Sequence, residues 1–256
     1  MRFSKWHALG NSYLVVERAD AGEPLSAERV RRLCDVNVGI GSDGVLEVVE
    51  ADASGARVVI WNPDGSQAEF SGNGTRIAAR WTMKRSGVRE VEIRVGDRRL
   101  TARQQDGTTV VMDVGDVEVD RPETLDVHGN PIDLIPVRVG NPHAVIPCEE
   151  PTREVLLRLG PLIETHPRFP HRTNVQLAHP DGRHDVRALV WERGTGETPA
   201  SGSSATAVAA VAVAQGWCES PVTVHMPGGD LVVTLENGRA TLTGPAEEIC
   251  TGNMTI

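Results

Sequence analysis

Two serine–glycine pairs in this sequence have the setting of an anion-binding or catalytic group. Ser71-Gly72 and Ser201-Gly202 are 130 residues apart, and each opens a segment whose pattern predicts a helix. The first turn of a helix leaves backbone N–H groups unpaired and carries the positive end of the helix dipole, so an anion could bind there. The plainer interpretation is that both serines are N-caps, a role that serine fills well.

The same offset relates other parts of the chain. A shift of 130 positions aligns Gly10-Asn11 with Gly140-Asn141, and Trp61 with Trp191, as well as the two serine–glycine pairs. One register that holds at separated places indicates a duplicated unit. We therefore expect two similar halves.

The residue pattern of each half predicts the same local order: a strand, then a Gly-rich or polar loop, then a helix. Alternating apolar residues predict strands over 57–61 and 186–191. Helices are expected over 71–81 and from 201 to about 214, and the second is so rich in Ala and Val that it is typical of a buried core helix. Two such helix starts, one from each half, would form a cleft with two similar anion-binding walls.

Length, composition and charge exclude several classes of protein. The 256 residues suit one large domain or two small ones, and 39% hydrophobic with 24% charged residues is ordinary for a globular protein. The net charge of −9 offers no basic surface for nucleic acid or an anionic membrane. Residues 1–7 reach no apolar signal segment, and the apolar stretch 205–214 is about half the length of a membrane span, so we expect a cytoplasmic protein.

Residues for metal or cofactor chemistry are scarce. The four cysteines are scattered without histidines at ligand spacing, so we predict no metal site and expect the cysteines to be small buried apolar groups. The only lysines, Lys5 and Lys84, lie outside the Gly-rich loops, which disfavours a pyridoxal phosphate Schiff base. Signatures of a serine hydrolase, a dinucleotide fold and a P-loop are missing as well. We therefore expect an enzyme without a cofactor.

Seven motifs occur in the order found in diaminopimelate epimerases, and this resemblance covers nearly the whole chain. In this sequence the motifs are residues 3–11, 39–44, 62–66, 72–76, 140–145, 172–175 and 192–198. Residues 242–247 resemble the segment by which the last strand of these proteins returns to the first domain.

The resemblance implies an α/β (α+β) fold of two pseudo-symmetric domains with the active site between them. Each domain would be a curled, mostly antiparallel sheet around a central helix, with expected bounds of 1–116 plus 245–256 and 117–244. The implied activity is isomerisation without pyridoxal phosphate: interconversion of LL- and meso-2,6-diaminopimelate, a precursor of lysine and peptidoglycan, by proton removal and return at the α-carbon. The family also implies a small amino-acid substrate and a homodimer.

The resemblance also implies the site residues. Family members use two cysteines, each directly before a glycine, on opposite faces of the substrate, and Ser71 and Ser201 stand at these positions. His143 and Glu192 are candidate activators, and Gly44 departs from the glutamine of many members. The implied substrate-binding residues are Asn11, Asn62, Gly72, Asn73, Asn141, Asn174, Glu192, Arg193, Gly202 and Ser203.

These residues have physical roles that suit a zwitterion charged at both ends. Backbone N–H groups in the two helix starts would hold the α-carboxylate and stabilise the charge of an enolate-like carbanion. Glu192 and Arg193 offer opposite charges to the distal ammonium and carboxylate. For the asparagines, turn formation is an equally good interpretation, because Asn favours turns beside Gly and Pro.

Serine at both acid–base positions is the main departure from the family. A helix start can lower the cysteine pKa from about 8.5 to near neutrality, whereas a serine hydroxyl needs an adjacent activator. A deliberate replacement of cysteine, a natural divergence and a loss of epimerisation would each explain it. Residues beside the two serines also depart from the usual family sequence, namely Phe70, Pro199 and Ala200. Deliberate replacement of the cysteines would not change these neighbours, so natural divergence is favoured. Alternatives to the epimerase are a racemase or isomerase for another amino acid and a silent amino-acid-binding protein.

Overall fold

The computed structural model describes residues 1–255, which divide into two compact units. The first unit comprises Met1–Asp113 together with the chain from Gly244 onward, and the second comprises Val114–Thr243. The chain passes into the second unit within β8 (Thr109–Asp116) and returns within β18 (Arg239–Pro245).

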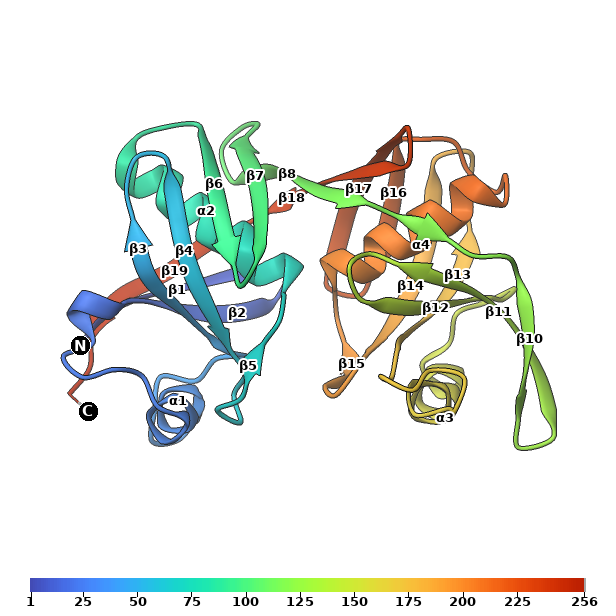
Figure 1. Ribbon diagram of the computed structural model, residues 1–256, viewed down its shortest axis with the longest axis horizontal. Coiled ribbons are helices and arrows are strands. Elements are labelled where there is room, and N and C mark those ends of the chain that lie inside the picture. Colours follow the sequence, from blue (N-terminus) through green and yellow to red (C-terminus); the bar gives the residue numbers. More distant parts are fainter. Residues whose placement is uncertain (256) are drawn as a thin grey trace. The chain divides into compact units, whose positions relative to one another are not determined.

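The first unit is a curled sheet that surrounds helix α2 (Figure 1). Its strands pair in the order β19, β1, β2, β3, β4, β6, β7, and only β2–β3 and β4–β6 are parallel. Because β19 pairs with β1, the C-terminal segment completes this sheet, as the sequence predicted. The elements are β1 (Arg2–Ala8), β2 (Asn11–Glu17), the short 3-10 helix η1 (Arg18–Asp20), α1 (Ala27–Cys34), β3 (Val45–Ala51), β4 (Gly55–Trp61), β5 (Gln67–Ala68), α2 (Gly72–Ser86), β6 (Glu90–Val95), β7 (Arg98–Gln104) and β19 (Glu247–Asn253).

The second unit repeats this plan around helix α4 (Figure 1). Strands β12–β13 and β14–β16 form its two parallel pairs, in the places that β2–β3 and β4–β6 hold in the first unit. The expected fold, two pseudo-symmetric and mostly antiparallel units, is confirmed. The elements are β9 (Glu118–Val119), β10 (Glu123–Val127), β11 (Asn130–Arg138), β12 (Pro142–Pro147), α3 (Arg153–Glu164), β13 (Asn174–Pro180), β14 (Asp185–Glu192), β15 (Gly196–Thr198), α4 (Gly202–Ala214), β16 (Val222–Met226) and β17 (Gly229–Glu236).

The two central helices form for local reasons and are then buried. Helix α2 begins after Ser71 and runs five residues beyond the expected end at 81, until Gly87 adopts a left-handed φ of 78°. Helix α4 ends at Ala214 as expected, and its residues from Gly202 to Ala212 are all buried. A helix that is apolar all round can only be stable inside the protein.

Each unit pairs a tryptophan indole N–H with a buried carboxylate. The two tryptophans match at the offset of 130, but Trp61 Nε1 donates to Glu47 on β3 at 3.1 Å, whereas Trp191 Nε1 donates to Glu164 on α3 at 2.7 Å. Both carboxylates are nearly inaccessible, with exposed fractions of 2% and 6%. Glu164 also accepts the Gly194 N–H at 2.9 Å, so it holds the turn that follows β14.

The cysteines differ in part from the expectation of burial. Cys34 and Cys218 are buried and Cys148 is partly buried, but Cys250 is exposed. Cys250 lies on β19, most of whose residues face solvent, so the strand rather than the residue type decides its exposure. Across residues 1–255, the helices are too short or too polar to span a membrane.

We predict that Glu164→Ala destabilises the protein by about 1–3 kcal/mol, because the substitution removes the buried carboxylate that accepts from the partly buried Trp191 indole and from the Gly194 N–H. Urea unfolding monitored by tryptophan fluorescence measures this loss. Glu154→Ala, on the exposed side of the same helix, is the control and should change the free energy of unfolding by less than about 1 kcal/mol. Equal losses in the two variants would contradict the role of Glu164.

Candidate active-site residues

Ser71 caps the central helix of the first unit. Its Oγ accepts a hydrogen bond from the Gly74 N–H at 3.0 Å, which confirms the capping interpretation for this serine. The hydroxyl of Tyr13, on β2, lies 3.1 Å from the same oxygen. Ser71 is therefore both a helix cap and a partner of a phenol.

Ser201 holds the same position in the second unit but bonds differently. It is the N-cap residue of α4 by backbone position, yet in the described chain its side chain makes no capping hydrogen bond. Instead its hydroxyl donates to Glu192 Oε2 at 2.9 Å, and Ser201 is only 4% exposed. The capping interpretation is wrong for the Ser201 side chain, because its hydroxyl is turned toward the Glu192 carboxylate and accepts no first-turn N–H.

Glu192 is placed to act as a base through Ser201. It ends β14, and burial raises the pKa of its carboxyl above the ordinary value, although the hydrogen bond from Ser201 opposes this shift. A raised pKa makes the carboxylate a stronger proton acceptor than an exposed glutamate. A perturbed pKa at a buried serine partner is typical of a functional site.

His143 is buried and neutral. Its Nε2 donates to Asn141 Oδ1 at 2.9 Å, and its Nδ1 accepts from Gln176 Nε2 at 3.1 Å, an assignment that follows because the Asn oxygen can only accept. Burial, together with the charge of Arg193, lowers the pKa of His143 to about 3. Both ring nitrogens are thus held by neighbours in the second unit.

Gln176 is a buried polar residue that the sequence analysis missed. It lies on β13 with no exposed surface, and its Nε2 also donates to Ser204 Oγ at 3.0 Å. Its Oε1 has no hydrogen-bond partner within residues 1–255. The only signal in the sequence was a polar residue inside an apolar strand, which by itself does not indicate a contact with His143 and the first turn of α4.

Arg76 was also missed, and it organises the asparagines of the first unit. The side chain is fully buried, and its Nη2 donates to Asn73 Oδ1 at 2.7 Å. Because arginine can only donate, Asn73 must turn its Nδ2 the other way, toward Asn11 Oδ1 at 3.2 Å. The structure therefore brings together two of the predicted binding residues, Asn11 and Asn73.

The charge of Arg76 makes the two helix starts unlike. Burial lowers the pKa of its guanidinium to about 10, so it remains a cation at neutral pH close to the positive end of α2. The matching residue of α4 is Thr206, whose hydroxyl bonds to Gly202 O at 2.9 Å. The first unit thus adds a cation near its serine, while the second adds the carboxylate of Glu192.

The other predicted asparagines have structural partners. Asn62 Nδ2 donates to Ser66 Oγ at 2.9 Å inside a tight turn, as the turn interpretation predicted. Asn174 joins two loops, since its Nδ2 donates to Pro142 O and its Oδ1 accepts the Arg193 N–H, both at 2.9 Å. The Arg193 guanidinium donates to His171 O at 3.2 Å.

The predicted backbone donors lie where the helix starts place them. Gly72 and Asn73 open α2, Gly202 and Ser203 open α4, and all four are buried. First-turn N–H groups have no acceptor within their own helix, so each unit offers buried donors for an anion. Within residues 1–255, no three His, Cys, Asp or Glu side chains gather as metal ligands.

The fold is shared with solved structures of isomerases and related proteins. A probable proline racemase from Agrobacterium radiobacter K84 superposes with a TM-score of 0.73 at 17% identity, covering 100% of this chain and 93% of its own. A phenazine biosynthesis protein of the PhzF family from Bacillus anthracis gives a TM-score of 0.73 at 14% identity, covering 100% and 99%. At these identities the likeness defines the class of fold alone.

Sequence comparison defines the family. The model of the family described as diaminopimelate epimerase matches residues 3–119 and 135–249. Diaminopimelate epimerase 2 of Nostoc sp. (strain PCC 7120) is 38% identical over 93% of this chain and 89% of its own length. The diaminopimelate epimerase of Pseudomonas fluorescens (strain Pf0-1) is 36% identical over 100% and 99%. This chain belongs to the diaminopimelate epimerase family.

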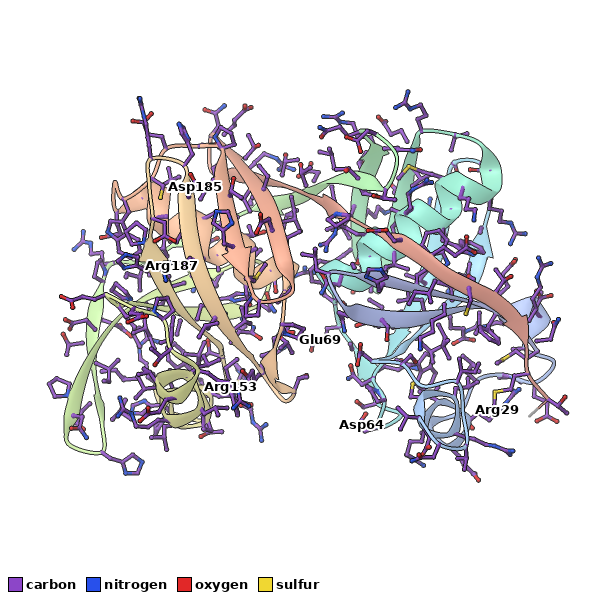
Figure 2. All side chains as sticks on the ribbon, turned by 180° about the vertical axis from the view of Figure 1, so that it is seen from behind. Arg29, Asp64, Glu69, Arg153, Asp185 and Arg187 are labelled. Carbon is purple, nitrogen blue, oxygen red and sulfur yellow. The ribbon has the colours of Figure 1, made fainter. Side chains whose placement is uncertain are left out.

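We predict that His143 stays neutral between pH 5 and 9, whereas His225 titrates above its ordinary pKa. Partial burial would lower the pKa of His225, but its hydrogen bonds to Asp230 and to Asp185, labelled in Figure 2, raise it. The imidazole C–H shifts in two-dimensional NMR measure both residues, with His143→Gln and His225→Gln for assignment. A midpoint for His143 inside this range would contradict the buried network.

Proposed function

We propose that this protein is a cofactor-independent isomerase that interconverts LL- and meso-2,6-diaminopimelate. Membership of the diaminopimelate epimerase family over both units supports the reaction. The observation that carries the proposal is the matched pair of buried helix starts, each with a serine at its N-cap position and a distinct proton partner beside it.

The first turn of the central helix in each unit, α2 or α4, is proposed as a binding site for the substrate α-carboxylate. Removal of the α-proton moves negative charge onto this carboxylate, and preorganised N–H donors stabilise such charge most effectively in a site without water. Arg76, buried in α2, strengthens the positive potential of one helix start. Glu192 and Arg193 stay the proposed partners of the distal charged groups, although Glu192 is also bonded to Ser201.

Proton removal is proposed to pass through Ser201 to Glu192. As the substrate Cα–H bond breaks, Ser201 Oγ takes that proton while its own hydroxyl proton moves to Glu192 Oε2. Ser201 ends as it began, the carboxylate becomes a carboxylic acid, and the substrate keeps the electron pair as a carbanion. The hydrogen bond of 2.9 Å from Ser201 to Glu192 supports this direction of transfer.

Three finer expectations concern the substrate, the oligomeric state and the location of the protein. The substrate is proposed to be a free small-molecule amino acid, in agreement with the epimerase relatives. The homodimer stays a prediction from the resemblance, and the cytoplasmic location stays a prediction from the composition of residues 1–7 and the short apolar stretch 205–214.

The decisive experiment is proton NMR of LL-diaminopimelate with the purified protein in D2O, with chiral chromatography to follow the meso isomer. We predict loss of the α-proton signal together with meso product. No exchange in the presence of binding would overturn the epimerase in favour of an amino-acid-binding protein.

Cysteine variants test the assignment of the two serines in the same assay. Ser71→Cys and Ser201→Cys should each raise the exchange rate by about 10-fold or more, because a thiol ionises far more readily than a hydroxyl at a helix start. Ser86→Cys, at the other end of α2, is the control and should leave the rate unchanged. If neither variant, nor the double variant, is faster, the positions or the substrate are wrong.

We predict that the rate falls at low pH through the protonation of Glu192. Because burial raises the pKa of this carboxyl, the fall should occur at a higher pH than for an exposed glutamate. Glu192→Gln should remove this dependence and lower kcat by roughly 10²- to 10⁴-fold. A pH–rate profile of both proteins measures the effect.

The stability of the Glu192 variant gives an independent check. An acid whose pKa is raised on folding stabilises the protein below its unfolded pKa and loses that contribution as pH rises through the folded value. Glu192→Gln should therefore unfold no more easily than the wild type at neutral pH. Glu197→Gln is the matched control: Glu197 pairs at the surface with Arg153, labelled in Figure 2, and its loss should leave the rate profile unchanged.

A further inference from the structure

Tyr13 is a buried residue whose hydroxyl lies beside Ser71, apart from the transfer through Ser201 and Glu192. It lies on β2, is only 6% exposed, and holds its hydroxyl 3.1 Å from Ser71 Oγ. The offset of 130 matches Tyr13 with His143 of the second unit. His143 is held by Asn141 and Gln176, whereas Tyr13 reaches the serine of its own unit.

Gly44 makes room for this tyrosine. A Cβ on Gly44 would lie 2.6 Å from Tyr13 Cε1 and 2.5 Å from Trp61 O, closer than a side chain can approach. Gly44 is also the position at which the sequence departs from the glutamine of many family members. The missing side chain and the tyrosine ring are therefore parts of one arrangement that brings a phenol to Ser71.

The hydrogen bonds around the two serines have opposite directions. Ser71 Oγ accepts the Gly74 N–H at 3.0 Å and lies beside the Tyr13 hydroxyl, so its own proton is available in a third direction. Ser201 gives its proton to Glu192 and keeps its lone pairs for a proton that arrives. Ser71 is thus set as a donor and Ser201 as an acceptor.

We propose that Tyr13 is the positioning residue that supplies protons to Ser71, an inference that rests on the proposed epimerase function. The carbanion takes the Ser71 hydroxyl proton and forms the new Cα–H bond. At the same time Ser71 Oγ takes the proton of the Tyr13 hydroxyl, which leaves a phenolate. Water then returns a proton to Tyr13 and removes the one held by Glu192, so the protein regains its starting state.

The chemistry of the two hydroxyls favours this relay. A phenol ionises near pH 10 in water, and an aliphatic hydroxyl is a much weaker acid. An alkoxide left on Ser71 would be costly in a buried site, whereas a proton from Tyr13 avoids it. Tyr13 acts only through Ser71, so it affects the proton-transfer step rather than substrate binding.

The first test is Tyr13→Phe, assayed by exchange and inversion of diaminopimelate in D2O. We expect kcat to fall roughly 10- to 100-fold with KM changed by less than about threefold, and the low-pH fall due to Glu192 to persist. In the Ser71→Cys background the same substitution should cost less than about threefold, because a thiol supplies its own proton. Full activity of Tyr13→Phe, or an equal loss in both backgrounds, would overturn the proposal.

The second test needs no turnover. In Ser71→Cys, the rate of alkylation by iodoacetamide against pH, followed by peptide mass spectrometry, reports the pKa of the introduced thiol. A hydrogen bond from Tyr13 stabilises the thiolate, so adding Tyr13→Phe should raise that pKa and slow alkylation at neutral pH by about threefold or more. Ser201→Cys is the control, and its thiol should not respond to Tyr13→Phe.

The two tests distinguish a failure of the proposed epimerase function from a failure of the role proposed for Tyr13. Absence of exchange by the wild type overturns the proposed function, while an unchanged thiol in the second test overturns the assignment of Tyr13. Gly44→Ala, which crowds the ring, should reproduce the effects of Tyr13→Phe on the thiol. Thermal unfolding of each variant confirms that the protein is folded in the assay.

Discussion

The structure depends on a buried helix start in each unit, where backbone N–H groups are left for a partner outside the helix. A helix end inside a protein is stable only if its donors find acceptors, so the first turns of α2 and α4 must be lined by small residues that admit one. The curled sheets pack around these helices and bury their first turns. The unpaired N–H groups of the first turn are costly to bury, and for the same reason they are suited to binding a carboxylate.

The two duplicated units share one backbone arrangement but differ in their charged side chains. The paired tryptophans bond to carboxylates from different elements, and the positions of Arg76 and Thr206 differ in charge. A reaction that removes a proton on one face and returns it on the other needs such asymmetry. Side chains beside the matched serines, rather than the serines themselves, provide it.

The paired serines lack the acidity of thiols, and in the proposed mechanism their neighbours supply the missing acid and base. Glu192 beside Ser201 is an acceptor of raised basicity, and Tyr13 beside Ser71 is a donor of moderate acidity. Each serine then needs only to pass a proton, without a stable charge of its own. In the proposed mechanism, this division lets a site of the family's shape work with serine at both thiol positions.

The sequence by itself determined the duplication, both central helices, the strands before them and the family. Periodicity and motif order are local signals, so they can be read from the sequence without knowledge of distant contacts. Only the tertiary structure decided that Ser201 bonds to Glu192, that Gly44 admits Tyr13 to Ser71, that Arg76 orients Asn73, and that Gln176 holds His143. These contacts depend on packing between separate strands and helices, and no local pattern in the chain specifies which buried polar groups will meet.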